Sequence, residues 1–203
     1  MTVTWLGHAC FQIEEAGYTV VLDPYTNVRG YPPLKLPCDE VLCTHQHFDH
    51  NYVNAAIPPV SECISPFEIE TVATFHDEKQ GALRGANTVY ILRSHGCSLV
   101  HLGDLGHRLT QEQAERMAHC DVLMIPVGGV YTIDAPAAKA VVEQLRPRIV
   151  VPMHYRHDPC GLENVAPAEE FLHLFPAEQV HYLSGSSFSP DGLSGVVVPR
   201  YPV

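Results

Sequence analysis

The chain has 203 residues, of which 46% are apolar, so it can bury a sizeable core and fits a single domain over residues 1–203. Its formal charge of −11 argues against nucleic acid as a partner, because nucleic-acid binders usually present a basic face. No apolar run approaches the length of a membrane span, and the first residues lack the basic-then-apolar pattern of a secretory signal, so we expect no membrane partner.

The N-terminal part of the chain has the pattern of an antiparallel sheet. Apolar residues alternate with polar ones over residues 2–6, 10–14 and 18–22, and Gly17 supplies the second turn. Glycine and proline then punctuate residues 27–37, which predicts a loop. Next we expect a buried strand over residues 41–44, followed by a short helix around residues 52–56.

Strands and helices alternate through the rest of the chain. Thr110 and Gln113 form a capping-box pattern that opens a helix reaching about His119, and Asp134 with Pro136 opens a second helix that ends before Pro147. A third helix is expected over residues 168–175. Strands are predicted near residues 69–75, 88–92, 98–102, 121–126, 148–153, 180–183 and 196–198. Strand clusters separated by helices favour a mixed α/β fold with two packed sheets and helices outside.

Three imidazoles and a carboxylate lie within six residues directly after the strand at 41–44. In an extended segment His45, His47 and Asp49 project to one side, because side chains alternate along a strand. A turn into a helix would bring His50 to face the same point. Imidazole and carboxylate together suit Zn²⁺, and also manganese or iron. The segment therefore predicts a metal site.

The H-x-H-x-D-H pattern of residues 45–50 resembles the signature of the metallo-β-lactamase superfamily. The resemblance extends to residues 3–11 with 21–24, and further short matches are residues 75–77, 101–107, 126–129 and 151–154. The N-terminal match is similar to the lactonase-like branch, which includes the ascorbate-6-phosphate lactonases. The resemblance implies an α/β fold of one domain, the four-layer αββα sandwich of the metallo-β-lactamase type.

The resemblance also implies a centre for two divalent metal ions, with Zn first and Mn or Fe as alternatives. Carried over to this chain, one ion would be held by His45, His47 and His76, and the other by Asp49, His50 and His154, with Asp104 bridging. His101 is the alternative to His76, but it lies on an apolar strand three residues before Asp104, so we expect it to support the site or the core.

Further residues are expected around the ligands. Metal-bound imidazoles usually donate their second N–H to a carboxylate or carbonyl, and Asp23, His8 and His107 are the candidates for such supporting roles. The polar loop over residues 77–87 follows His76 and is expected to be mobile and to contact substrate. The candidates for substrate binding are Arg84, Asn87 and Tyr155.

These expectations define a metal-dependent hydrolase of a small ester, lactone or phosphoester. A hydroxide that bridges the two ions would attack the substrate, with Asp49 and Asp104 as the catalytic carboxylates. Two alternatives stay open, a mononuclear non-haem iron dioxygenase of the same fold and a non-catalytic metal-binding protein. The seven cysteines form no C-x-x-C pair, so we expect them reduced in a cytoplasmic protein. The apolar stretch over residues 52–60 could form a homo-oligomer contact.

Overall fold

The alternating N-terminal segments form the centre of a five-stranded sheet. In the computed structural model, which describes residues 1–58 and 63–201, the sheet order is β13-β1-β2-β3-β5. The antiparallel strands β1 (Thr2–Gly7), β2 (Cys10–Glu15) and β3 (Tyr18–Leu22) follow the predicted ranges. At the edges, β5 (Glu40–Leu42) pairs parallel to β3, and β13 (Ser187–Phe188) pairs antiparallel to β1.

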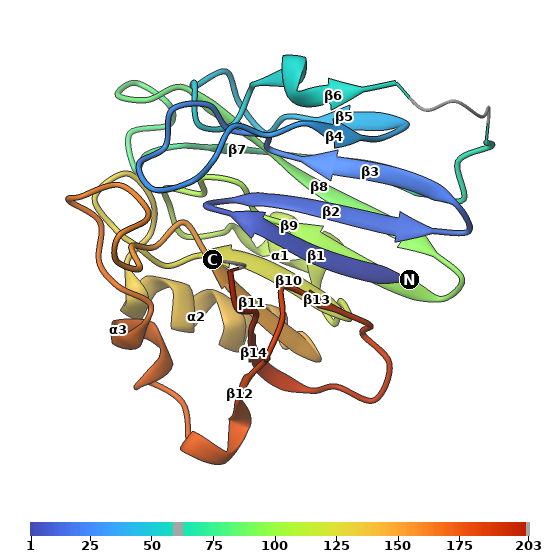
Figure 1. Cartoon of the computed structure of the whole chain (residues 1–203). Helices are drawn as coiled ribbons and strands as arrows, with labels where there is room; N and C mark the ends of the chain where they lie inside the picture. Colours follow the sequence, from blue (N-terminus) through green and yellow to red (C-terminus); the bar gives the residue numbers. More distant parts are fainter. Residues whose placement is uncertain (59–62, 202–203) are drawn as a thin grey trace.

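A second sheet of seven strands packs against the first, in the order β12-β14-β11-β10-β9-β8-β7 (Figure 1). Its strands are β7 (Glu68–Phe75), β8 (Ala86–Ser94), β9 (Cys97–His101), β10 (Val122–Pro126), β11 (Ile149–Met153), β12 (Val180–Tyr182) and β14 (Gly195–Val198). The first three are antiparallel, whereas β9, β10, β11, β14 and β12 run parallel. Every residue of β10 and β11 is buried, which explains their continuous apolar sequence.

The two longer helices connect parallel strands of this sheet. Helix α1 (Gln111–Met117) links β9 to β10 and begins with the predicted capping box at Thr110. Helix α2 (Ala135–Leu145) links β10 to β11 and begins at Asp134, whose side chain accepts a hydrogen bond from the amide of Ala137. Right-handed crossovers place both helices on the same face of the sheet. Helix α3 (Glu169–Leu172) is shorter than the predicted range of 168–175.

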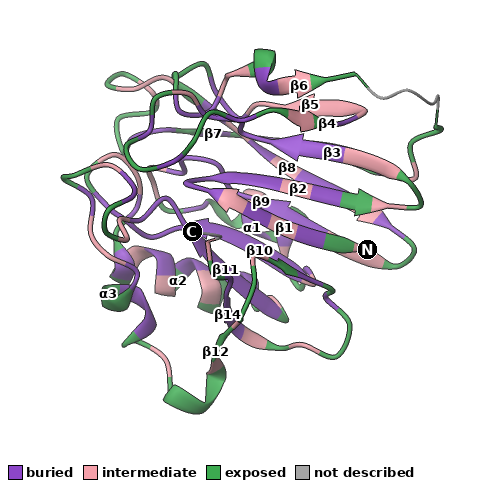
Figure 2. Ribbon diagram, in the orientation of Figure 1, coloured by how far each residue is buried: buried purple, intermediate pink, exposed green. Residues whose placement is uncertain are grey.

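The main core lies between the sheets and continues beneath helices α1 and α2, and Figure 2 shows the buried residues along the facing strands. Phe11 and Leu22 from the first sheet belong to the same buried cluster as Leu99 from the second. The opposite face of the first sheet has its own cluster, in which Val21 packs with loop residues such as Tyr25. Over that face the described chain supplies a loop, one 3-10 turn η1 (Val53–Ala55) and the small pair β4 (Leu36–Pro37) and β6 (Ala56–Ile57).

The fold is thus the predicted α/β sandwich, with two differences in detail. The helix predicted around residues 52–56 is a single 3-10 turn, so in the described residues a loop layer takes the place of an outer helix on that side. The strands β4, β6 and β13 span two residues each, which is too short for a periodic signal.

Among the helices of the described part of the chain, none has the length and apolar character needed to cross a membrane.

The apolar stretch at residues 52–60 lies only partly within the described residues, since residues 59 and 60 fall outside them. Val53 and Ile57 are exposed, so the surface that such a contact would use is present on this part of the stretch. A homo-oligomer contact there stays a prediction.

Strand direction gathers the functional loops at one edge of the sandwich. Strands β9, β10 and β11 run parallel, and β7 runs the same way because it is separated from β9 by one antiparallel neighbour. Their carboxyl ends therefore meet at a common edge. In the first sheet β1 and β3 also share a direction. A hydrogen bond from the amide of His154 to the carbonyl of His8, 3.2 Å long, joins the carboxyl ends of the two sheets.

We expect Phe11→Ala to lower the free energy of unfolding by about 3–5 kcal/mol, because its fully buried ring fills the space between the sheets. Ile64→Ala is the control, since its side chain is 95% exposed and its removal should change stability by less than about 0.5 kcal/mol. Chemical denaturation followed by circular dichroism measures both. Equal stabilities of the two variants would contradict the assignment of the core.

Candidate metal centre

The predicted ligands follow the carboxyl ends of separate strands. Residues 45–50 form the loop after β5, His76 follows β7, Asp104 lies three residues beyond β9, and His154 follows β11. Because these ends share one edge of the sandwich, the side chains converge although the residues are up to 109 positions apart in sequence (154 − 45 = 109). His8 joins them from the end of β1.

The backbone at this edge adopts conformations that few residues favour. His8, Asp23 and His154 all have left-handed backbone angles, with φ of 51°, 47° and 54°. Such angles cost a non-glycine residue of the order of 1 kcal/mol and concentrate at functional sites. Two glycines make room for the ligands, because a Cβ on Gly106 would lie 2.3 Å from the backbone of His76, and one on Gly128 would lie 2.2 Å from that of His154.

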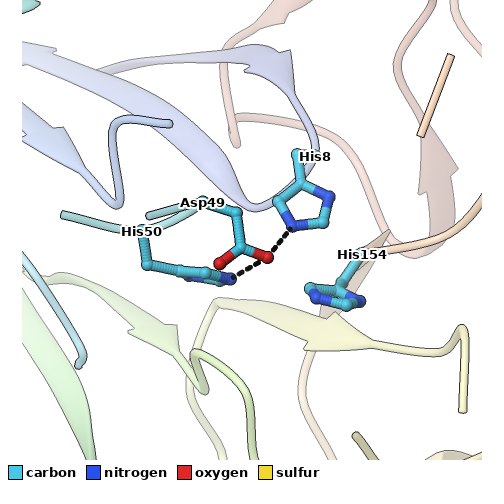
Figure 3. Close-up of side chains that lie close together, drawn as sticks. All are labelled: His8, Asp49, His50 and His154. Carbon is cyan, nitrogen blue, oxygen red and sulfur yellow. Dashed lines mark hydrogen bonds and ion pairs between the residues drawn. The ribbon is translucent and has the colours of Figure 1, made fainter. Parts of the chain in front are cut away.

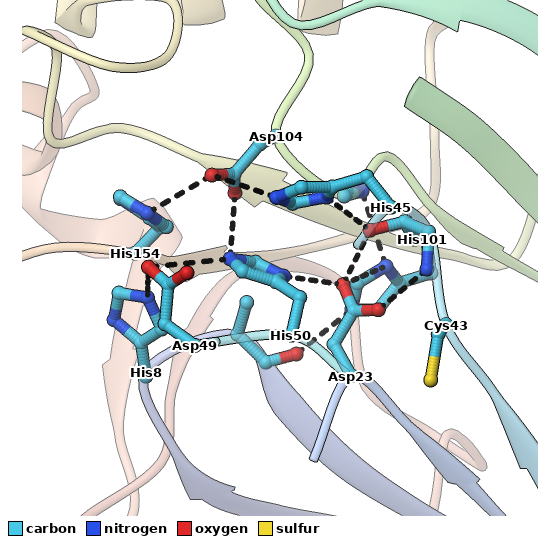
Figure 4. A network of polar contacts seen from close by, with 12 residues as sticks. His8, Asp23, Cys43, His45, Asp49, His50, His101, Asp104 and His154 are labelled. Atoms are coloured by element: carbon cyan, nitrogen blue, oxygen red, sulfur yellow. Dashed lines mark hydrogen bonds and ion pairs between the residues drawn. The ribbon is translucent and has the colours of Figure 1, made fainter. Parts of the chain in front are cut away.

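The carboxylate of Asp104 lies at the centre of the converging imidazoles (Figure 4). Its Oδ2 is 3.1 Å from His76 Nε2, 3.2 Å from His154 Nε2 and 3.8 Å from His45 Nε2. Its Oδ1 is 3.2 Å from His50 Nε2. Asp104 therefore touches imidazoles that the sequence assigned to both ions, which is the arrangement that a bridging carboxylate requires.

The donor atoms fall into overlapping groups. In each group the nitrogen and oxygen atoms lie within 4.8 Å of one another: His45, His47 and His76 in the first, His8, Asp49, His50 and His154 in the second, and His45, His50 and Asp104 between them. The second group is drawn in Figure 3. All seven predicted ligands thus belong to one cluster. His8 is an eighth member, with its Nε2 3.2 Å from Asp49 Oδ2.

Several of these buried atoms have no hydrogen-bond partner, although they lie close together. His45 Nε2, His50 Nε2, Asp104 Oδ1 and both ring nitrogens of His154 are in this position. A buried polar atom without a partner costs about 1–3 kcal/mol, so such a concentration calls for a ligand. Nitrogen and carboxylate oxygen atoms directed at shared points are the donor set that Zn²⁺, Mn²⁺ or Fe²⁺ takes. The residues therefore fit divalent cations.

Asp23 orients two of the imidazoles from behind. Its carboxylate accepts hydrogen bonds from the Thr44 amide (2.7 Å), the Thr44 hydroxyl (2.8 Å) and His50 Nδ1 (2.7 Å). Because the Thr44 hydroxyl donates to Asp23, its oxygen accepts from His45 Nδ1 at 3.0 Å. Nδ1 of each ring is thus directed at its support and Nε2 at the cluster, which is the orientation of a metal-bound histidine. Asp23 thus occupies the supporting role expected for it.

Burial and charge prepare the protonation states that metal binding needs. Burial, with His50 nearby, lowers the pKa of His45 to about 3. Burial and the neighbouring His154 lower the pKa of His8 to about 4. Burial would raise the pKa of Asp104, but His154 and His50 hold it well below its ordinary value. Asp49 has a lowered pKa because the hydrogen bond from His8 outweighs the effect of its burial. His45 and His8 are therefore neutral and both carboxylates ionised at neutral pH. Burial would lower the pKa of His50 and of His76, but Asp104 raises both, with Asp23 also acting on His50, so a cation that binds there displaces a proton.

Two other histidines near matched segments lie outside the cluster. His101 uses both ring nitrogens, since Nε2 donates to the Ala9 carbonyl and Nδ1 accepts from the Gly103 amide. Of the two alternatives, the structure therefore brings His76 to the cluster, and His101 supports the loop that carries Asp104. His107 was expected to support a metal ligand, but its ring forms hydrogen bonds with the Phe75 amide and the Arg108 carbonyl and with no ligand side chain.

Two residues expected to bind substrate face elsewhere. Asn87 is 1% exposed and lies in β8, where its Oδ1 accepts from the Asp104 amide at 3.0 Å and its Nδ2 donates to the Leu102 carbonyl. It positions the Asp104 loop rather than a substrate. Tyr155 is buried with its ring stacked on Trp5, 5.5 Å between centroids, and it lines a different cavity.

A cavity of about 510 Å³ opens beside the cluster. It is lined by Gln46, His47, Phe48, Asp49, His76, Arg84, Asp104, Tyr131 and Leu162. Arg84 reaches it from the loop after His76, which was expected to be mobile. The carboxylate of Asp77 instead organises this loop by accepting hydrogen bonds from four backbone amides, those of Lys79, Gly81, Leu83 and Arg84. Phe48 and Leu162 were missed as cavity residues, because no local pattern distinguishes them from ordinary apolar residues.

Comparisons with known proteins agree with this geometry. The profile of the β-lactamase superfamily domain matches residues 2–154. A UPF0173 protein of Pyrococcus furiosus is 30% identical over 84% of this chain and 89% of its own length. A UPF0173 metal-dependent hydrolase of Hyperthermus butylicus is 27% identical over 77% of this chain and 84% of its own. The solved structure of a Thermotoga maritima protein, assigned to the Zn-dependent hydrolases of the metallo-β-lactamase superfamily, superposes with a TM-score of 0.75 at 34% identity, covering 99% of both chains.

We expect Asp23→Asn to weaken metal binding about 10- to 100-fold without removing a metal donor, because an amide cannot accept from Thr44 and His50 as the carboxylate does. Titration of the metal-free protein against a competing chelator measures the affinity. Asp121→Asn is the matched control, since Asp121 also accepts from a serine amide and hydroxyl but lies outside the cluster. Unchanged affinity in Asp23→Asn would contradict the orienting role.

Proposed function

The chain belongs to the β-lactamase superfamily, and on this premise we propose that it is a dinuclear metal-dependent hydrolase of a small ester, lactone or phosphoester. The observation that carries the proposal is the set of buried donor atoms around Asp104 that lack hydrogen-bond partners. Similar proteins named as metal-dependent hydrolases support the same reaction class. The cavity beside the cluster has the volume of a small-molecule site.

Each ion has a distinct set of ligands in this proposal. His45, His47 and His76 hold the first, whereas Asp49, His50 and His154 hold the second, and Asp104 serves both. When bound, two such cations lower the pKa of a shared water, so hydroxide is available near neutral pH. Zinc is the first expectation for this donor set, with manganese or iron as alternatives.

The chain's own residues supply orientation, proton handling and charge. Asp49 is buried yet lines the cavity, and His8 fixes its carboxylate through the contact of 3.2 Å between Nε2 and Oδ2. Asp49 can therefore orient the attacking water and accept a proton that a leaving group later needs. Arg84 presents a cation at the cavity wall, where it can stabilise negative charge on the substrate. The seven cysteines form no C-x-x-C pair, which supports the cytoplasmic location that we propose.

We expect protein purified without added metal or chelator to contain two equivalents of zinc or manganese per chain. Removal of the metal with a chelator should abolish hydrolysis, and its return should restore activity. Elemental analysis and an assay across esters, lactones and phosphoesters test this expectation. A single equivalent of iron together with oxygen consumption would instead favour the dioxygenase of the same fold.

We expect Asp104→Ala and His47→Ala each to lower kcat/KM by about 100-fold or more, because each removes a donor from the ion cluster. His173→Ala is the control, since this exposed histidine lies at the end of α3. Steady-state kinetics should be measured beside metal content. Full activity in both Asp104→Ala and His47→Ala would contradict the proposed centre.

A further inference from the structure

Among the described residues, Arg84 has no carboxylate partner, in contrast to most arginines of this part of the chain. Five arginines form ion pairs: Arg29, Arg93, Arg116, Arg148 and Arg156. Within residues 1–58 and 63–201, the one hydrogen bond of the Arg84 guanidinium runs from Nη2 to the Val130 carbonyl, at 3.0 Å. The remaining N–H groups of this planar cation are left for a ligand, and the side chain lines the cavity at the metal cluster.

The Arg84 side chain is held in place before any ligand binds. The backbone amide of Arg84 donates a hydrogen bond to Asp77 at 2.8 Å, and the guanidinium carbon lies 5.7 Å from the centre of the Tyr131 ring. The Tyr131 hydroxyl in turn accepts a hydrogen bond of 2.6 Å from Asn164. Little conformational entropy is therefore lost when an anion binds here, and a planar guanidinium suits the paired oxygens of a carboxylate or phosphate.

Another wall of the same cavity is apolar. Phe48 is 56% exposed, although it lies between two predicted metal ligands, His47 and Asp49. A hydrogen bond of 3.1 Å from the Thr26 amide to its carbonyl fixes the loop. Leu162 lines the cavity with it. A single exposed apolar residue is ordinary, but this one stands on the loop that carries the metal ligands and forms a surface on which a substrate can pack.

We propose that the substrate is a small ester or lactone that carries both an anionic group, bound by Arg84, and an apolar group, packed on Phe48 and Leu162. This inference rests on the proposed function and names its substrate class. The anion can be a carboxylate or a phosphate, since both present paired oxygens to a guanidinium. The volume of about 510 Å³ suits a molecule of metabolite size.

The formal charge of −11 makes this selectivity local rather than global. An anion is repelled by the protein as a whole, so its recognition depends on the one cation at the cavity wall and on the bound metal ions. Removal of Arg84 should therefore abolish the preference for anionic substrates, because the cavity lining contains no other lysine or arginine that could replace it.

The first test uses para-nitrophenyl esters that share one leaving group and one acyl chain length. The acyl chain of the ester ends in a carboxylate, a phosphonate or a methyl group. We expect metal-loaded protein to prefer an anionic ester over the neutral one by about 10- to 100-fold in kcat/KM. The carboxylate and phosphonate arms show which anion is favoured. Arg84→Gln should abolish the preference, and Arg84→Lys should keep part of it.

Arg108→Gln is the matched control, because Arg108 is an exposed arginine that lines the adjoining cavity but not the one at the metal cluster. It should keep the preference. For the apolar wall, Phe48→Ala should raise KM about tenfold for an anionic ester with a phenyl group on its acyl chain. Val53→Ala is the corresponding control, since Val53 is 51% exposed outside the cavity.

Calorimetry provides a second readout that needs no turnover. The carboxylate product of the anionic ester should bind metal-loaded wild-type protein at least about tenfold more tightly than Arg84→Gln. Equal kinetics with neutral and anionic esters, or a preference lost in Arg108→Gln and kept in Arg84→Gln, would overturn the substrate class but leave the hydrolase intact. Full metal loading without hydrolysis of any ester, lactone or phosphoester would overturn the proposed function, and the calorimetric comparison would still decide the role of Arg84.

Discussion

The buried carboxylate of Asp23 is the interaction on which the rest of the centre depends. It lies at the end of β3 and joins the first sheet to the loop that carries most of the predicted ligands. Through Thr44 and His50 it fixes the protonated nitrogen of two rings at once, one directly and one through the threonine hydroxyl. Its charge is compensated by donors on every side, which is why burial is tolerated.

The centre is unfavourable for the folded chain by itself. It concentrates imidazoles without hydrogen-bond partners, ionised carboxylates and left-handed backbone in one largely buried region. The core between two sheets supplies the compensating stability, because long apolar strands such as β10 and β11 are wholly buried directly behind the loops. Rigid strands and strained loops therefore perform separate tasks, and bound cations would relieve the strain.

The ligands and the cavity rim differ in how they are supported. Several ligands are braced by buried partners, such as Asp23 behind His50 and Asn87 at the amide of Asp104. The rim is built from loops that only meet in space, where Arg84 from one loop bonds to Val130 of another. Such a division lets substrate choice vary with the rim while the metal centre stays the same.

The sequence alone determined most of the strands and helices and the candidate metal donors. Periodicity located the main strands, capping at Thr110 and Asp134 located the starts of two helices, and the density of His45 to His50 indicated metal, because these are local properties. Only the tertiary structure decided between His76 and His101, turned Asn87 from a substrate contact into a support, and placed Phe48 beside Arg84. Those outcomes depend on which strand ends are neighbours and on where each buried polar atom finds its partner, and neither is encoded in local spacing.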